Sequence, residues 1–353
     1  MVMMSKFHRA AAIVAIVGAL GAGISGSPAH ATNAPGDSTP GTASGSNADP
    51  TKAVVGVRAL VPPEARSART LGTEREGSGV LIRDDNLIVT IGYLLMEAHT
   101  VEVVAADGKR IPAAIVAYDA ESGFGLLRAV RALDARPIRF GDSDALKIAD
   151  RVLALSRAAG TAAATPARVV SRRTFAGYWE YLLDNAIFTS PPHLTFGGAA
   201  LLAEDGSLIG IGSLFVNDSA LPETFSPGNM FVPINGLKPI FAELVDKGRR
   251  SDSPKPWLGI YSTVAQGRIV VTRIADDSPA KAAGLRPGDA IIGVDGSKVQ
   301  DLADLYRRAW AHGAAGVEVP LDVLKSASDE PKIERVMVRS IDRAKWLRTH
   351  KGF

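Results

Sequence analysis

The sequence predicts a mainly β protein: a closed barrel or a pair of barrels, followed by a small α+β module. Short apolar runs between turn-forming residues recur at regular spacing from residue 54 to residue 233, which is typical of closed β architectures. With 35 glycines, 21 prolines and only 6% aromatic residues among 353, the composition favours turns and strands over long helices. The length and the 46% of hydrophobic residues are sufficient for more than one domain.

The first half of the chain contains six predicted strands, each a short apolar run that ends at a polar turn. Asp107-Gly108 supplies the positive φ that a tight hairpin between two of them needs. The predicted strands span residues 54–59, 79–82, 87–90, 101–104, 111–116 and 124–129.

A second group of apolar runs follows, with another hairpin signal at Asp205-Gly206. Its predicted strands span residues 151–155, 167–170, 199–202, 208–211 and 231–233, and a helix is predicted near 237–246. The last third differs, because helices alternate with strands there. Strands are predicted over 268–274, 290–294, 321–324 and 333–338, and helices over 279–284 and 301–311.

The N-terminus has the pattern of a signal peptide. Lys6 and Arg9 precede a small, apolar stretch over residues 10–24, and Ala29-His30-Ala31 has the small-x-small pattern of a cleavage site. We therefore predict a signal peptide over residues 1–31, cleaved after Ala31, and a flexible linker rich in Gly, Ser and Thr over 32–52. Retention as an anchor is the alternative, although the apolar run is shorter than the roughly 20 residues that span a bilayer. The expected location is the bacterial periplasm, with no stable membrane span after cleavage.

Composition also excludes several kinds of site. The chain has no cysteine, which excludes disulfides, thiolate metal sites and cysteine nucleophiles. A formal net charge of +3 argues against a nucleic-acid partner. No two histidines at ligand spacing accompany carboxylates, so no metal or other cofactor is predicted.

The last third resembles a bacterial PDZ domain. Residues 278–289 read Ser-Pro-Ala-Lys-Ala-Ala-Gly-Leu-Arg-Pro-Gly-Asp, like the signature of that family, and 256–260 read Pro-Trp-Leu-Gly-Ile, like its carboxylate-binding loop. Backbone N–H groups at such a glycine form a nest for a C-terminal carboxylate, and the strand after it offers a free edge to a peptide. The resemblance implies a peptide-binding loop made by Trp257, Leu258, Gly259 and Ile260. It also implies that Leu305, Tyr306 and Ala309 form the wall of a pocket for the last side chain of the ligand.

The region before this module resembles the HtrA/Deg serine proteases, in which a trypsin-like double β-barrel precedes a PDZ domain. The resemblance lies in Gly-Ser-Gly at 77–79, Gly-Asp-Ser-Asp at 141–144, Phe-Gly-Gly-Ala at 196–199 and the hairpin at 205–211. It implies a trypsin-like domain over residues 53–247, a linker over 248–255, a PDZ domain over 256–341 and a basic tail over 342–353.

The catalytic residues of that family are missing at the matching positions. A serine protease needs a hydroxyl nucleophile, an imidazole base and a carboxylate that orients the base. The family's histidine, aspartate and serine are matched by Tyr93, Gly123 and Phe196, and Leu194 replaces a glycine of the oxyanion hole. No catalytic residue is therefore assigned, and the chain is predicted to be proteolytically inactive.

The predicted function is binding of peptides or protein C-termini through the PDZ domain, in envelope protein quality control or as a scaffold. One alternative is an active periplasmic serine endopeptidase with a non-standard arrangement, for which His193 is the one plausible base. A third class is a holdase that uses the barrel cleft as an apolar groove. Asp119 and Glu121 are interpreted as surface charges.

Two further features bear on partners. Residues 52–73 lack the aromatic side chains through which the resembled family commonly forms trimers, so a homo-oligomer is left open. The chain ends at Phe353, whose apolar side chain and free carboxylate suit the predicted groove, either of its own molecule or of a neighbour. A solvated basic tail is nevertheless the favoured interpretation of residues 342–353, and docking of Phe353 is the alternative.

Overall fold

The computed structural model describes residues 49–158, 160–326 and 332–347. The predicted signal peptide, most of the predicted linker and Phe353 lie outside the described residues. Among the residues that are described, no helix is both long enough and apolar enough to cross a membrane.

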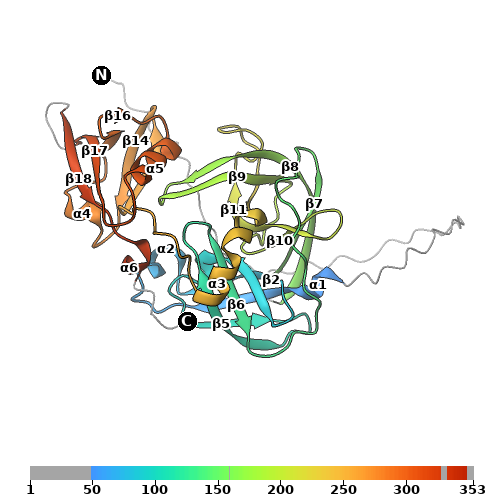
Figure 1. Cartoon of the computed structure of the whole chain (residues 1–353). Coiled ribbons are helices and arrows are strands. Elements are labelled where there is room, and N and C mark those ends of the chain that lie inside the picture. The colour runs from blue at the N-terminus through green and yellow to red at the C-terminus, as the bar shows by residue number, and fades with distance from the viewer. Residues whose placement is uncertain (1–48, 159, 327–331, 348–353) are drawn as a thin grey trace, which may run out of the picture. The chain divides into compact units, whose positions relative to one another are not determined.

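The first β-barrel is built from residues 54–129 and is coloured blue to teal in Figure 1. Its strands close in the order β1-β2-β3-β6-β5-β4, and every pair is antiparallel. The strands are β1 (Val54–Leu60), β2 (Glu74–Leu81), β3 (Leu87–Ile91), β4 (Thr100–Val104), β5 (Arg110–Tyr118) and β6 (Phe124–Ala129).

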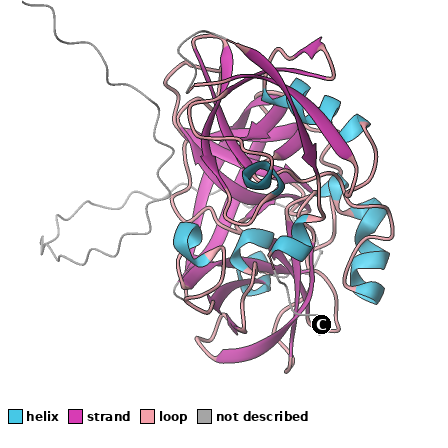
Figure 2. Ribbon diagram, turned by 90° about the vertical axis from the view of Figure 1, so that its left-hand side faces the viewer, coloured by secondary structure: helices cyan, strands magenta, loops and turns pink. Residues whose placement is uncertain are grey.

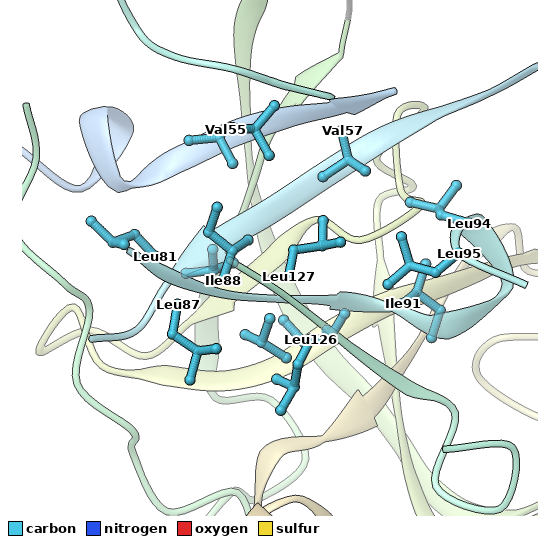
Figure 3. Packing of buried hydrophobic residues seen from close by; sticks show 14 of the residues in the cluster. Val55, Val57, Leu81, Leu87, Ile88, Ile91, Leu94, Leu95, Leu126 and Leu127 are labelled. Atoms are coloured by element: carbon cyan, nitrogen blue, oxygen red, sulfur yellow. The ribbon is translucent and has the colours of Figure 1, made fainter. Parts of the chain in front are cut away.

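Aliphatic side chains fill the interior of this barrel. Figure 3 shows Val55 and Val57 of β1 with Ile88 of β3 and with Leu126 and Leu127 of β6. All five are at most 2% exposed, so β3 and β6 have apolar neighbours on both faces. Burial on both faces explains why these strands appear in the sequence as continuous apolar runs rather than as alternating ones.

The second β-barrel is built from residues 151–233, green to yellow in Figure 1. It closes in the order β10-β11-β12-β9-β8-β7. Its strands are β7 (Arg151–Ala158), β8 (Thr161–Gly177), β9 (Tyr181–Ser190), β10 (Ala200–Leu202), β11 (Leu208–Val216) and β12 (Gly228–Pro233).

Strands β8 and β9 differ most from the sequence prediction, which places a strand only at 167–170 and none over 181–190. Only part of each strand pairs with the neighbouring strand of the barrel. Strand β7 pairs with residues 161–168 of β8, and β12 pairs with residues 187–189 of β9. Beyond those residues the two strands pair with each other, down to Gly177↔Tyr181. This two-stranded ribbon has polar residues such as Arg172 and Arg173, because it has no barrel interior to fill.

The third unit is a sheet over residues 260–339 with two helices, orange to red in Figure 1. Its strand order is β13-β14-β15-β17-β18, with β16 paired to β15, so β13 is an edge strand. The strands are β13 (Ile260–Ala265), β14 (Arg268–Ile274), β15 (Ala290–Val294), β16 (Ser297–Lys298), β17 (Glu318–Leu324) and β18 (Ile333–Arg339). Together with the two barrels, it confirms the predicted mainly β fold.

Helices are short throughout, and Figure 2 shows them as cyan elements among the magenta strands. The longest is α5 (Leu302–Ala311), which Asp301 caps by accepting a hydrogen bond from Asp304 N. The others are α1 (Pro50–Ala53), α2 (Ala68–Leu71), α3 (Phe241–Lys247), α4 (Pro279–Ala282) and α6 (Arg343–Trp346), with 3₁₀ turns η1 (Gly92–Leu94), η2 (Ile234–Gly236) and η3 (Lys238–Ile240).

The described part of the expected basic tail is structured, and two of its residues are buried. Helix α6 lies within it, and Trp346 and Leu347 are 9% and 1% exposed. The Trp346 indole N–H donates to the Asp276 carbonyl, and its ring lies 4.7 Å from that of Trp257. Burial of the Trp346 ring therefore anchors this segment to the protein in spite of its basic residues.

Candidate functional site

Tyr93 lies on η1, directly after β3, and faces the second barrel. Its hydroxyl donates a hydrogen bond of 3.1 Å to the carbonyl of Ser213 on β11. A Cβ added to Gly197 would lie only 2.8 Å from that hydroxyl oxygen, which places Tyr93 against the loop of Phe196. Burial raises the pKa of Tyr93 above the ordinary value of about 10, so the phenol stays protonated and cannot act as a base.

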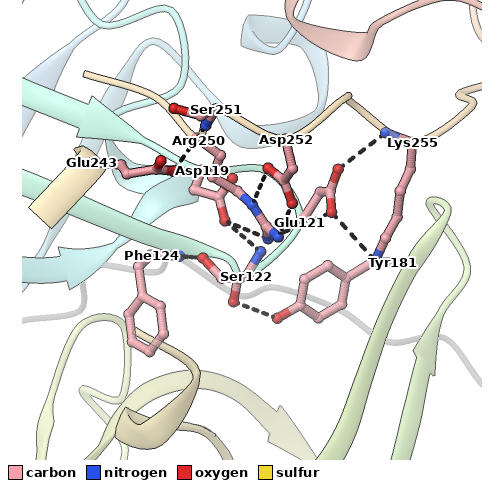
Figure 4. Close-up of polar contacts among 10 residues, drawn as sticks. All are labelled: Asp119, Glu121, Ser122, Phe124, Tyr181, Glu243, Arg250, Ser251, Asp252 and Lys255. Atoms are coloured by element: carbon pink, nitrogen blue, oxygen red, sulfur yellow. Dashed lines mark hydrogen bonds and ion pairs between the residues drawn. The ribbon is translucent and has the colours of Figure 1, made fainter. Parts of the chain in front are cut away.

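Gly123 lies at the start of β6 and next to η1, because Gly92 N donates to its carbonyl over 2.7 Å. Its φ of +83° is a conformation that glycine adopts readily and other residues rarely do. A Cβ at this position would lie 2.9 Å from the hydroxyl oxygen of Tyr181. That hydroxyl donates to the carbonyl of Ser122, as Figure 4 shows. A phenol from β9 therefore lies where a side chain at position 123 would extend.

Phe196 lies on the loop before β10 and is tied to both barrels through its neighbours. Gly197 accepts a hydrogen bond from Ser78 N of β2, and Gly198 donates to Gly212 of β11, both over 2.8 Å. The Phe196 side chain is half-buried and offers no nucleophilic atom. The structure thus brings positions 93, 123 and 196 together between the barrels, and none of the three holds a base, a carboxylate or a hydroxyl nucleophile.

His193, the alternative base, is buried and contacts three hydroxyl groups, of which Ser156 is buried, Thr165 half-buried and Thr195 exposed. Its Nε2 is 2.8 Å from Ser156 Oγ and 3.2 Å from Thr195 Oγ1, and its Nδ1 is 2.8 Å from Thr165 Oγ1. The serine–imidazole distance is that of a nucleophile and its base. However, the group behind the imidazole is a threonine rather than a carboxylate, and Ser156 is 0% exposed. A nucleophile without access to solvent cannot meet a peptide bond, so we interpret this network as structural.

Burial lowers the pKa of His193, and this predicts a pH dependence of stability. The unfolded chain takes up a proton near the ordinary pKa of about 6.5, while folded His193 takes it up only at lower pH. The free energy of unfolding should therefore fall as the pH drops below about 6.5. Urea midpoints at pH 7.5 and pH 5.5 should differ less in His193→Gln than in the wild type. The same difference in both proteins would show that His193 does not cause the slope.

Asp119 and Glu121 are not the free surface charges that the sequence suggests. Both lie within 4 Å of Arg250 in the 248–255 segment, at 3.8 Å and 3.5 Å respectively, and Glu121 also lies 3.3 Å from Lys255. Asp119 is 7% exposed and accepts a hydrogen bond from Ser122 N. Figure 4 shows these carboxylates gathered around Arg250. They fasten the predicted linker to the first barrel.

The predicted carboxylate-binding loop holds a carboxylate of the chain itself. The backbone N–H groups of Leu258, Gly259 and Ile260 donate to the Glu180 carboxylate over 2.8, 2.6 and 2.7 Å. Gly259 has a φ of +85°, and a Cβ there would lie 2.2 Å from Ser278 Cβ, so the loop requires glycine. Burial raises the pKa of Glu180 to about 7, while the three N–H groups act in the opposite direction.

The other residues predicted for this groove divide into two sets. Trp257 packs against Trp346 and pairs through its backbone with Ile341, so it anchors the loop from behind. Gly259 takes part through its N–H group and does not line the pocket beside Glu180. The predicted residues that line this small pocket are Leu258, Ile260, Leu305, Tyr306 and Ala309. Sequence reasoning missed three further lining residues, Ser262, Trp310 and Glu180 itself. Phe353, the expected self-ligand, lies outside the described residues.

Comparisons with known proteins agree with this architecture. Residues 77–211 match the family model of the trypsin-like peptidase domain, and residues 256–332 match that of the PDZ domain. The serine protease Do-like HtrA of Lactobacillus helveticus is 27% identical over 288 residues, which cover 73% of this chain and 68% of that protein. The periplasmic serine endoprotease DegP of Escherichia coli (strain K12) is 27% identical over 244 residues, which cover 65% of this chain and 50% of that protein.

A solved structure of the HtrA-type protease AlgW with decapeptide superposes with a TM-score of 0.51 at 18% identity, covering 82% of this chain and 95% of that one. At this identity the likeness shows the fold. The chain spans between half and about two thirds of the length of the two curated relatives. The chain therefore contains a trypsin-like peptidase domain followed by a PDZ domain, and in this order of domains and in its relatives it is similar to the HtrA-type serine proteases.

Proposed function

We propose that this chain is a proteolytically inactive member of the HtrA-type family that binds peptides or protein C-termini through its PDZ groove. The observation that carries the proposal is the set of side chains between the two barrels, at the positions that match the catalytic residues of the resembled family. Tyr93 is protonated and bonded to Ser213, Gly123 is faced by the Tyr181 phenol, and Phe196 stands at the nucleophile position. The positions of the base, the orienting carboxylate and the nucleophile therefore hold no group that could perform acyl transfer.

The PDZ groove supports the binding part of the proposal. Three successive backbone N–H groups converge on the two oxygens of one carboxylate, which is the geometry needed to hold a chain terminus. The neighbouring edge strand β13 and the apolar residues of α5 supply the rest of a peptide site. The AlgW protease was solved with a decapeptide, which is consistent with this use of the fold.

The proposal places the protein in the bacterial envelope, as a scaffold or quality-control factor. Its support is the signal-peptide pattern of residues 1–31 together with relatives that are named as periplasmic. The barrels would then serve to position the PDZ groove, and no cofactor or metal takes part.

Binding of a C-terminus can be tested by fluorescence polarisation with labelled decapeptides that end in valine, leucine or phenylalanine, each made as the acid and as the amide. We expect the best acid to bind at least about tenfold more tightly than its amide, because hydrogen bonds to a charged group contribute about 1.5–3 kcal/mol each. In parallel, the purified protein and its Phe196→Ala variant should both leave casein intact.

Equal binding of acid and amide would refute recognition of a C-terminus. Casein cleavage by the wild type that is lost in Ser156→Ala would revive the alternative of an active endopeptidase.

A further inference from the structure

The tip of the β8–β9 hairpin occupies the PDZ groove. The tip comprises Gly177, Tyr178, Trp179 and Glu180, between the end of β8 and the start of β9. It reaches three separate parts of the third unit. Glu180 accepts from the loop at 258–260, the Tyr178 carbonyl accepts from Ser262 N of β13 over 3.0 Å, and the Gly177 carbonyl accepts from the Tyr306 hydroxyl of α5 over 2.7 Å.

These contacts have the arrangement that a bound C-terminal peptide would have. The carboxylate lies in the nest of N–H groups, and the residue two positions before it accepts one hydrogen bond from the free edge of β13, the edge to which a peptide strand would be added. The pocket beside the carboxylate is walled by Leu258, Ile260 and Leu305, among others. The side-chain carboxylate of Glu180 therefore occupies the position that the C-terminal carboxylate of a bound peptide would occupy.

The hairpin is built to present this carboxylate. Glu180 has a φ of +58°, in the left-handed region that a residue other than glycine rarely adopts. Trp179 stacks on Tyr181 with ring centroids 5.9 Å apart, and Tyr178 lies against Tyr261 of β13 at 6.2 Å. A left-handed third residue is usual in a three-residue hairpin loop, and the aromatic contacts on both sides hold the tip in this conformation.

We infer that the hairpin tip is an internal ligand of the PDZ groove, and that a free C-terminal peptide binds only by displacing Glu180 from the loop at 258–260. The inference rests on the proposed function, because it concerns the same groove and the same class of ligand. Displacement would also pull on Tyr181, the residue next to Glu180, whose hydroxyl lies against Gly123 in the barrel cleft.

The expected effect follows from mass action within one molecule. A tethered ligand has an effective concentration of about 1 mM. If the tip binds with an intrinsic Kd of about 10–100 µM, the groove is closed in about 90–99% of molecules, and the apparent affinity for an external peptide falls about 10- to 100-fold.

The test compares two variants of the full chain that remove the Glu180 carboxylate. Glu180→Gln removes the charge, and Glu180→Gly removes the side chain at a φ that suits glycine. Both should bind the labelled acid decapeptides at least about tenfold more tightly than the wild type, with the amides as reference. Asp184→Asn is the matched control. Asp184 lies on the same hairpin and pairs with Arg307 of α5 over 2.7 Å, but this pair is exposed and does not touch the loop, so affinity should change less than about twofold.

Hydrogen exchange provides a readout that does not depend on a peptide. The amides of Leu258, Gly259 and Ile260 should exchange at least about tenfold faster in Glu180→Gly than in the wild type, with matching urea midpoints as proof of folding. Unchanged exchange, or acid-selective binding of equal strength in wild type and variants, would overturn the inference and leave the proposed function standing. If no protein prefers the acid to the amide, the proposed function fails, and the internal ligand with it.

Discussion

The triple variant Tyr93→His, Gly123→Asp, Phe196→Ser is expected to cleave casein at less than about a thousandth of the rate of an active relative. The new aspartate would have to adopt a φ of +83°, and its Cβ would lie 2.9 Å from the Tyr181 hydroxyl oxygen, so it cannot orient the new histidine. In trypsin-like enzymes the loss of the orienting carboxylate alone lowers kcat about 10⁴-fold. We expect Leu194 to hold its backbone N–H less favourably than the glycine of an active relative, and the loss of one oxyanion-hole donor costs about 10²–10³ in kcat.

The control adds Tyr181→Phe and Leu194→Gly to the triple variant. Removing the phenol oxygen that faces position 123 and restoring the glycine should raise the cleavage rate above that of the triple variant, although φ at position 123 stays unfavourable. Urea midpoints would establish that each variant is folded. Robust cleavage by the triple variant itself would show that the cleft is already competent and that only three side chains separate it from an active protease.

The variant Gly198→Ala is expected to lose about 2–5 kcal/mol of its free energy of unfolding. Gly198 has a φ of +74°, where a residue with a Cβ costs about 1–2 kcal/mol. Its Cβ would also lie 1.9 Å from the carbonyl oxygen of Ser78, which is backbone of β2 and cannot move aside cheaply. Forcing them apart would break the bond between Ser78 N and the Gly197 carbonyl, which ties the loop of Phe196 to the first barrel.

Gly206→Ala is the matched control, because Gly206 has a φ of +76° with no atom within 4 Å of its Cβ position. It should lose only the conformational cost, about 1–2 kcal/mol. Urea unfolding of both variants measures the two losses, and their difference isolates the contact between the barrels. Equal losses of unfolding free energy in the two variants would mean that the loop of Phe196 can move away from β2 at no cost in stability.

The sequence by itself was sufficient for much of the architecture. Strands β6 and β15 have the bounds that their apolar runs predict. A strand that is buried in a sheet appears in the sequence as a short apolar run, so its bounds are a local property. The positions matched to the catalytic residues of the resembled family, Tyr93, Gly123 and Phe196, could be located in the same way, because they are single positions inside recognisable motifs; the loss of activity stays a prediction. The loop at 258–260 could be located because its glycine and its place before a PDZ signature are local features; its role in peptide binding stays a prediction.

Only the tertiary structure decided what these parts contact. Glu180 reaches Leu258 across 78 positions of sequence, Tyr93 reaches Ser213 across 120, and His193 contacts Ser156 across 37. Local periodicity carries no information on such pairs, because they depend on how each barrel closes and on where the β8–β9 ribbon ends. The PDZ-like loop and the apolar helix after it predicted a groove for C-termini with an apolar last residue; the hairpin register Gly177↔Tyr181 places the carboxylate of Glu180 at that loop.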